Sequence, residues 1–258
     1  MSGTPDERLA RVLLGWPEEM RVLRRFGLHD GQRLLDLGSG PGVVAAELLR
    51  LLPGSTLVAV DSRAEGLPHV WEVPGPGVAH MALLRATVTR LPLRADAFDF
   101  ALARLVFQYL PRPVEAAREA MRVLCPGGRL AVSDVDRTLS LAVNPALPEL
   151  EMLMSRYDAW HRDRGGDRGV GARLRDILRE AGAGRVETET IRFESRPETA
   201  ELYLEALMGP RRLRGLREAG YATQAEVDDF LAARAQWLLS PGRAVSRYLR
   251  IACGTKER

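Results

Sequence analysis

The stretch Leu34–Gly42 reads LLDLGSGPG, and it decides the fold class of this chain. Three leucines and one acid form a short apolar run of the kind found in buried strands. An apolar, helix-like segment, Val43–Leu52, follows directly. Between the two, glycines fall at alternate positions, namely Gly38, Gly40 and Gly42. Glycines allow a tight turn and a close backbone approach to a ligand, and the first turn of a helix offers free N–H groups. The stretch therefore predicts a strand, a ligand-binding turn and a helix.

The spacing of these glycines is GxGxG, whereas dinucleotide-binding folds use GxGxxG. Asp36 stands two residues before the first glycine. A second strand-like run, Thr56–Val60, ends at Asp61, which lies about twenty residues further on, as in Rossmann-type units. An acid at that position can accept hydrogen bonds from ribose hydroxyls. These features indicate a nucleoside-type ligand at the carboxyl ends of neighbouring strands.

A third motif lies in Phe98–Gly128, which reads FDFALARLVFQYLPRPVEAAREAMRVLCPGG. It looks like a fourth strand, a helix and an RVLxPGG turn. Together the three motifs resemble the class I S-adenosylmethionine-dependent methyltransferases over about residues 20–136. The resemblance implies an α/β fold with a Rossmann-like, doubly wound, seven-stranded sheet. That sheet is expected to be mostly parallel with an antiparallel last strand, and helical cap insertions are expected beside it.

S-adenosyl-L-methionine is the cofactor that the resemblance implies. By similarity, Asp36 would help to hold its amino group, although a buried acid could equally tie down the turn through backbone N–H groups. Many relatives carry an acid after the third strand, and the matching residue here is the uncharged Thr87. The implied cofactor-binding residues are Asp36, Gly38, Ser39, Gly40, Gly42, Asp61, Ser62, Thr87, Val88, Ala103 and Arg104.

The remaining chain was assigned from its hydrophobic pattern. Ser62–His80 is rich in proline and glycine, so we expect a loop with local turns there. The other elements are expected as a helix at Glu7–Leu14, a helix at Pro17–Phe26, a third strand within Val78–Val88, a fourth at Phe98–Ala103, a helix at Pro113–Leu124, a fifth strand at Arg129–Asp134, a helix at Pro148–His161, a sixth strand at Val186–Phe193 and a last strand at Val245–Cys253. The last two strands would form an antiparallel pair.

We expect one methyltransferase domain over residues 1–258. It would comprise N-terminal helices in 1–30, a cofactor-binding core in 31–136 and helical cap segments in 138–182 and 197–239. The cap segments carry apolar stripes that the basic fold does not need, and we expect them over the carboxyl edge of the sheet. An apolar cap suits a small or medium organic methyl acceptor, possibly of secondary metabolism.

Two residues are candidates for a catalytic role. His161 follows the apolar stripe of its helix, and the pKa of histidine suits a general base, although a lone histidine at a helix end is more often a cap or solvated. Gln108 follows the fourth strand and would point to the acceptor. Asp134 and Asp136 end the fifth strand, where either could position an acceptor or cap the next segment.

Composition sets limits on partners and location. The formal net charge is only +3, from 37 basic and 34 acidic residues, and no long run of one sign occurs. This argues against nucleic acid as the main ligand, and no membrane partner is expected. Two cysteines without a metal-ligand pattern and an N-terminus without an apolar leader suggest a cytoplasmic protein. The oligomeric state stays open. Two rival functions are a methyltransferase-like cofactor-binding protein without methyl transfer, such as a cyclase or structural partner, and an RNA or protein methyltransferase.

Overall fold

The computed structural model describes residues 13–63, 80–139 and 141–257. These residues form one sheet with the strand order β3-β2-β1-β4-β5-β8-β6, while β7 pairs with the other edge of β8 along most of its length. The strands are β1 (Arg33–Leu37), β2 (Thr56–Asp61), β3 (Met81–Arg85), β4 (Phe98–Arg104), β5 (Leu124–Asp134), β6 (Ala142–Asn144), β7 (Ala183–Glu194) and β8 (Ala244–Lys256). β1 to β5 run parallel, and β8 is antiparallel to each of its neighbours β5, β6 and β7.

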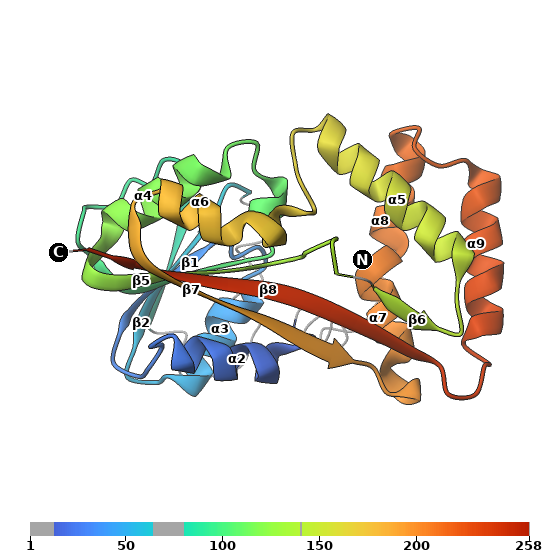
Figure 1. Ribbon diagram of the computed structural model, residues 1–258, viewed down its shortest axis with the longest axis horizontal. Helices are drawn as coiled ribbons and strands as arrows, with labels where there is room; N and C mark the ends of the chain where they lie inside the picture. Colours follow the sequence, from blue (N-terminus) through green and yellow to red (C-terminus); the bar gives the residue numbers. More distant parts are fainter. Residues whose placement is uncertain (1–12, 64–79, 140, 258) are drawn as a thin grey trace.

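Helices cover both faces of this sheet (Figure 1). The α-helices are α2 (Trp16–Arg25), α3 (Val43–Leu51), α4 (Pro113–Val123), α5 (Pro148–Asp163), α6 (Leu174–Glu180), α7 (Ala200–Met208), α8 (Pro210–Glu218) and α9 (Gln224–Trp237). Short 3-10 turns lie at η3 (Phe107–Tyr109), η4 (Val170–Arg173) and η5 (Pro197–Thr199). α2 and α3 lie on one face, and α4 and α6 lie on the other.

The two faces are packed by alternate residues of the same strands, as the period of two in a strand requires. Leu34, Phe100 and Leu102 belong to the core on the side of α2 and α3. Leu35 and Ala101 belong to the core on the side of α4 and α6. Burial on both faces explains why these strands read as nearly continuous apolar runs instead of alternating ones.

The antiparallel pair of strands β7 and β8 extends beyond the parallel strands and connects the sheet to a second group of helices (Figure 1). This group consists of α5, α7, α8 and α9, and it lies beyond the end at which β7 finishes. Because β7 is parallel to β5, that end is the carboxyl edge of the parallel strands. The apolar core on the α2 and α3 side continues into these helices through residues such as Leu153, Leu204 and Phe230.

The expected Rossmann-like sheet with antiparallel late strands is confirmed, with three differences. A short strand, β6, adds an eighth member at the start of β8. β5 begins at Leu124, so Pro126, Gly127 and Gly128 lie within it, with a register shift against β4. Within the segment 138–182, only α5 joins the distant helices, because Leu174, Ile177 and Leu178 of α6 are packed on the sheet beside α4. The expected helix at Glu7–Leu14 and most of the expected loop at Ser62–His80 lie outside the described residues.

Candidate functional site

The glycine turn after β1 is held against the end of β2. The N–H groups of Gly38 and Ser39 both donate to the carbonyl of Val60, at 2.7 and 3.0 Å. Gly38 has a positive φ of 72°, and a Cβ there would lie 2.4 Å from Cγ2 of Val106. This glycine is therefore required by conformation and by the close packing of the turn on the segment after β4.

Gly40 differs from Gly38 in what surrounds it. Its φ is also positive, at 53°, but a Cβ there would meet no atom of the chain within 4 Å. Its N–H donates to Oδ2 of Asp61 at 2.8 Å, while Oδ1 of Asp61 accepts from the N–H of Arg63 at 2.8 Å. Asp61 thus fixes the turn from β2, and each of its oxygens keeps a lone pair for another donor such as a ribose hydroxyl.

A cavity of about 270 Å³ opens beside this turn. One side is formed by the turn and by residues at the ends of β1 and β4, and the other by β7, β8 and the helices α7 and α8. The lining residues are Leu14, Asp36, Gly38, Ser39, Gly40, Pro41, Val44, Arg104, Leu105, Phe193, Ala206, Arg212, Arg247 and Leu249. The cavity therefore joins the carboxyl edge of the sheet, where open α/β sheets bind ligands, to the distant helices.

Acidic groups gather at the turn side of the cavity. Glu19 of α2 is fully buried, and its Oε2 accepts from Nε of Arg104 at 2.7 Å. Asp36 is 2% exposed, and burial raises its pKa from 3.8 to about 7, with nearby Asp61 adding to the rise and Arg104 opposing it. Two acids against one arginine favour a cationic group in this part of the cavity.

Several buried polar atoms on this side have no hydrogen-bond partner among the residues that the structure describes. They are Nε1 of Trp16, Oε1 of Glu19, Oδ2 of Asp36 and Oγ of Ser39. A buried unpaired polar atom is costly, so such a group indicates a ligand or ordered water. The free space next to Gly40 and the unpaired acid oxygens fit a nucleoside cofactor that carries a positive charge, as S-adenosyl-L-methionine does.

Leu105 follows β4 and adopts a positive φ of 58°, which is uncommon for a residue with a branched side chain. Its N–H donates to the carbonyl of Ser133 at 2.7 Å, and its side chain lines the cavity. Strained backbone of this kind persists only where the surrounding structure enforces it, and it is concentrated at ligand sites. Its position supports the carboxyl end of β4 as part of the functional site.

The far side of the cavity is basic and apolar. Phe193 of β7 and Arg247 of β8 are directly opposite in the antiparallel register, so both side chains lie on one face. The guanidinium of Arg247 lies 5.8 Å from the centre of the Phe193 ring. Arg212 of α8 donates through Nη1 to the carbonyls of Ala206 and Leu207 at the end of α7, which orients it along the same cavity.

Five of the predicted cofactor residues line the cavity, namely Asp36, Gly38, Ser39, Gly40 and Arg104. Six do not, and one of these is Asp61, whose carboxylate contacts Gly40 of the turn instead. Ala103 is buried within β4, and Val88 is buried in the core on the α4 side. Ser62 and Thr87 are exposed, and Oγ1 of Thr87 lies 3.3 Å from Oγ1 of Thr89. Gly42 is the N-cap of α3 and does not line the cavity either. Roles for these residues in binding the cofactor stay predictions.

His161 is not placed as a general base would be. Its side chain is buried among Tyr109, Tyr157 and Trp160, at ring-centre distances of 4.9, 4.6 and 6.5 Å, and it does not line the cavity. Burial, together with the charge of Arg168, lowers its pKa from 6.5 to about 4. Such a histidine is neutral and weakly basic at pH 7, so the structure does not support the expected base.

Gln108 is also turned away from the cavity. Its Nε2 donates to Oδ1 of the fully buried Asp134 at 2.9 Å, and its backbone N–H donates to Oδ2 at 3.0 Å. Asp134 requires these donors in the core, so the structure does not bring the Gln108 side chain to the cavity, and its contact with an acceptor stays a prediction. Asp136 accepts from Thr138 and Arg250, which matches the capping alternative for that residue.

The sequence gives no specific role to Glu19, Arg212 or Arg247. Arg212 and Arg247 lie in segments far from the glycine turn in sequence, among many other arginines. Glu19 occupies a helix whose charged residues are otherwise exposed or half-buried. Only the pairing of Glu19 with the motif residue Arg104 distinguishes it, and that contact spans 85 positions.

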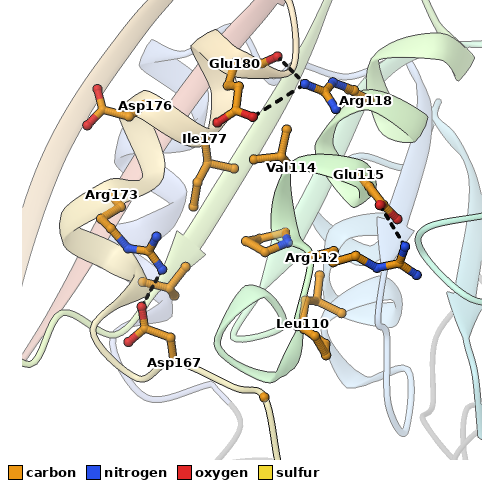
Figure 2. Close-up of a pocket in the computed structure, with 14 residues that line it drawn as sticks. Leu110, Arg112, Val114, Glu115, Arg118, Asp167, Arg173, Asp176, Ile177 and Glu180 are labelled. Carbon is orange, nitrogen blue, oxygen red and sulfur yellow. Dashed lines mark hydrogen bonds and ion pairs between the residues drawn. The ribbon is translucent and has the colours of Figure 1, made fainter. Parts of the chain in front are cut away.

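A larger groove of about 450 Å³ lies between α4 and α6 (Figure 2). Its apolar floor includes Val114 and Ile177. Most charged residues at its rim are paired with one another, as Arg112 with Glu115, Arg118 with Glu180 and Arg173 with Asp167. The groove contains none of the residues predicted for the cofactor or for catalysis, and its paired charges offer less to a polar ligand than the smaller cavity does.

Comparison with known proteins gives consistent matches. Residues 35–132 match the methyltransferase domain family. The malonyl-[acyl-carrier protein] O-methyltransferase of Methylococcus capsulatus is 37% identical over 101 residues, which cover 39% of this chain and 36% of that protein. The ubiquinone/menaquinone biosynthesis C-methyltransferase UbiE of Syntrophotalea carbinolica is 30% identical over 138 residues, or 54% of this chain and 56% of that protein.

A solved structure of an S-adenosylmethionine-dependent methyltransferase from Aquifex aeolicus superposes with a TM-score of 0.51 and 25% identity, covering 69% of this chain and 85% of that one. The matched region thus spans little more than a third to just over half of the two curated relatives. The family match covers residues 35–132, from β1 into β5, and the distant helices lie outside it. Among the described residues, none of the helices has the length and apolar character needed to span a membrane.

Proposed function

We propose that this chain is a class I S-adenosylmethionine-dependent methyltransferase and that it transfers the methyl group of that cofactor to a small organic acceptor. The observation that supports this most is the cavity itself. It runs without interruption from the glycine turn and Asp36 to Arg212 and Arg247. Donor and acceptor would thus be bound side by side, in the arrangement that in-line transfer requires.

The chain's residues would act mainly by binding and alignment. Asp61 would accept from ribose hydroxyls while it holds the N–H of Gly40. Glu19 and Asp36 would face the positively charged amino-acid part of the cofactor, with Arg104 setting the position of Glu19. S-adenosyl-L-methionine supplies an activated methyl group on a sulfonium. The apolar residues Leu105, Phe193 and Leu249 would keep water away from it.

The acceptor is proposed to be small or medium in size, because the cavity measures only about 270 Å³ and the helices α7 and α8 close one side of it. The two curated relatives are named for malonyl-[acyl-carrier protein] and for the quinone pathway. A role in secondary metabolism, with α5 and α7 to α9 acting as an acceptor cap, extends this proposal.

Two measurements test the proposal. Calorimetry should show that S-adenosylhomocysteine binds, and labelled S-adenosylmethionine should transfer its methyl group to small molecules in a fractionated extract. If the label appeared only in RNA or protein, the chain would instead be an RNA or protein methyltransferase. Binding without transfer to any fraction would favour a cofactor-binding protein without methyl transfer. Failure of S-adenosylhomocysteine to bind would overturn the cofactor assignment itself.

A further inference from the structure

Two arginines on the far side of the cavity lack an acidic partner. Within the described residues, neither Arg212 nor Arg247 forms an ion pair with a carboxylate, whereas Arg104 on the turn side is paired with Glu19. Arg247 is half-buried and rests on Phe193. Arg212 uses Nη1 for two carbonyls of α7, which leaves Nε and Nη2 for other acceptors. Two guanidinium groups are thus concentrated on one wall without compensation.

A third arginine intensifies this charge. Arg168 has a side chain that is 4% exposed, and its nearest carboxylate, Asp158, is shared with Arg137. The guanidiniums of Arg168 and Arg212 lie 4.8 and 5.0 Å from the centre of the Tyr157 ring. Burial, together with repulsion by Arg212, Arg168 and Arg104, lowers the pKa of Arg247 from 12.5 to about 9. An isolated arrangement of this kind is unfavourable, and an anion would relieve it.

The same wall offers no residue that could remove a proton. Among the described residues that line the cavity, Asp36 is the one group whose pKa lies near neutrality, and it belongs to the glycine turn at the other side. His161 is buried outside the cavity. An acceptor whose attacking atom is already ionised, such as a carboxylate oxygen, needs no base. The missing base and the uncompensated arginines therefore favour the same kind of acceptor.

We propose that the methyl acceptor is an organic anion and that Arg212 and Arg247 bind its anionic oxygen group. Guanidinium forks match carboxylate and phosphate oxygens in geometry, and Phe193 and Leu249 provide an apolar surface for the rest of the molecule. This inference rests on the proposed function, since it names the substrate class for the same cavity. An alternative source of the anion is the carboxylate of the cofactor, which the experiment must separate.

Inorganic phosphate is a suitable probe, because it is small enough for any oxyanion site. Thermal unfolding is followed in protein saturated with S-adenosylhomocysteine, which keeps phosphate off the glycine turn, at constant ionic strength set with chloride. The wild-type protein should show a saturable rise in Tm with phosphate. Arg247→Gln should weaken the apparent phosphate affinity by about 10- to 100-fold, the scale of lost charged hydrogen bonds, and Arg247→Lys should recover part of it.

Arg211→Gln is the matched control, since Arg211 is an exposed neighbour of Arg212 on α8 that does not line the cavity. Its phosphate response should equal that of the wild-type protein. Absence of a saturable response in the wild-type protein, or an unchanged response in Arg247→Gln, would overturn the inference. Arg212→Gln is secondary, because it also removes hydrogen bonds to the end of α7.

A second set of titrations separates the two sources of the anion. S-adenosylhomocysteine has a carboxylate, and methylthioadenosine lacks the amino-acid part. If Arg247→Gln weakens S-adenosylhomocysteine but not methylthioadenosine, the arginines bind the cofactor and the acceptor inference is wrong. If neither affinity changes while the phosphate response is lost, the inference is supported. If S-adenosylhomocysteine does not bind the wild-type protein at all, the proposed function fails first, which is a distinct result.

Discussion

The two walls of the cavity differ in charge and in origin. The turn side combines Asp36, Glu19 and Arg104 and is acidic on balance, whereas the far side presents Arg212 and Arg247 without acids. The turn-side lining comes from the matched domain and from residues just before it, and the far side from β7, β8 and the helices between them. One wall thus suits a cationic group, and the other suits an anion. The division suggests that cofactor and acceptor binding can be altered separately.

The largest effect is expected from Gly40→Val. A side chain at Gly40 would project into open space beside the turn, where the chain itself offers no obstacle. We expect S-adenosylhomocysteine affinity to fall by about 100-fold or more, because a ligand held by the turn would meet the new side chain. Calorimetry measures the affinity, and thermal unfolding confirms that the variant is folded.

Gly182→Val is the control for backbone strain. Gly182 also has a positive φ, of 90°, and open space around it, but it lies between α6 and β7, away from the cavity. It should cost similar stability and leave the affinity unchanged. If Gly40→Val kept the wild-type affinity for S-adenosylhomocysteine, the glycine turn would not be part of the cofactor site.

A smaller loss is expected from Asp61→Ala. Its carboxylate holds the N–H of Gly40 and keeps lone pairs for ribose hydroxyls. The affinity for S-adenosylhomocysteine should fall by roughly 1.5–3 kcal/mol, the scale of hydrogen bonds to a charged group. Asp99→Ala, which removes a surface acid paired with Arg33, should leave it unchanged. Equal affinities for the Asp61 variant and the wild-type protein would remove Asp61 from the site.

Asp36→Asn tests how the buried carboxyl on the turn side affects stability as the pH changes. Because burial raises the pKa of Asp36 to about 7 from an ordinary 3.8, folding binds a proton between these pH values. The free-energy cost of ionising the buried Asp36 carboxyl is absent below about pH 4, grows as the pH rises and is complete above about pH 7. Relative to Asp36→Asn, the wild-type free energy of unfolding should therefore fall by roughly 1–3 kcal/mol between pH 5 and pH 8. Denaturant titrations at several pH values measure this difference.

The same variant should also change the pH dependence of binding. A cationic ligand group beside Asp36 favours the ionised carboxyl, so wild-type affinity for S-adenosylhomocysteine should weaken as the pH falls below about 7. Asp36→Asn should be weaker at pH 8 and nearly independent of pH. A wild-type affinity that does not vary from pH 5 to pH 8 would contradict the cationic character of this wall.

The smallest effect is expected from His161→Phe, because His161 lies in an aromatic cluster and does not line the cavity. The ring is replaced within an aromatic cluster, so stability at pH 8 should change by less than about 1.5 kcal/mol and cofactor affinity should not change. The pKa of His161 is lowered from 6.5 to about 4. The wild-type protein should therefore lose stability relative to the variant as the pH falls from 6.5 to 4, opposite in direction to Asp36. Loss of methyl transfer at full cofactor affinity would restore the catalytic role that the geometry argues against.

The sequence by itself determined the sheet and the cofactor-binding turn. These depend on local chemistry: a buried apolar run, glycines where φ must be positive, and an acid at the end of the next strand. Such features lie within a few residues of one another, and the register of β1 with β2 then places Asp61 beside Gly40. The apolar pattern also located the last two strands, and the resemblance to the methyltransferase fold implied their antiparallel pairing, which the structure confirms.

Only the tertiary structure decided which residues form the second wall. Arg247 of β8 is paired with Phe193 of β7, which places both side chains at the cavity. Arg212 reaches the cavity because α8 begins where α7 ends, and its guanidinium donates to carbonyls there. Neither position has a local signature among the many arginines of the chain. Conversely, His161 and Gln108 have side chains suited to catalysis, but packing directs them into an aromatic cluster and onto Asp134. Side-chain type is read from sequence, whereas its direction and its partners follow from contacts between segments far apart in the chain.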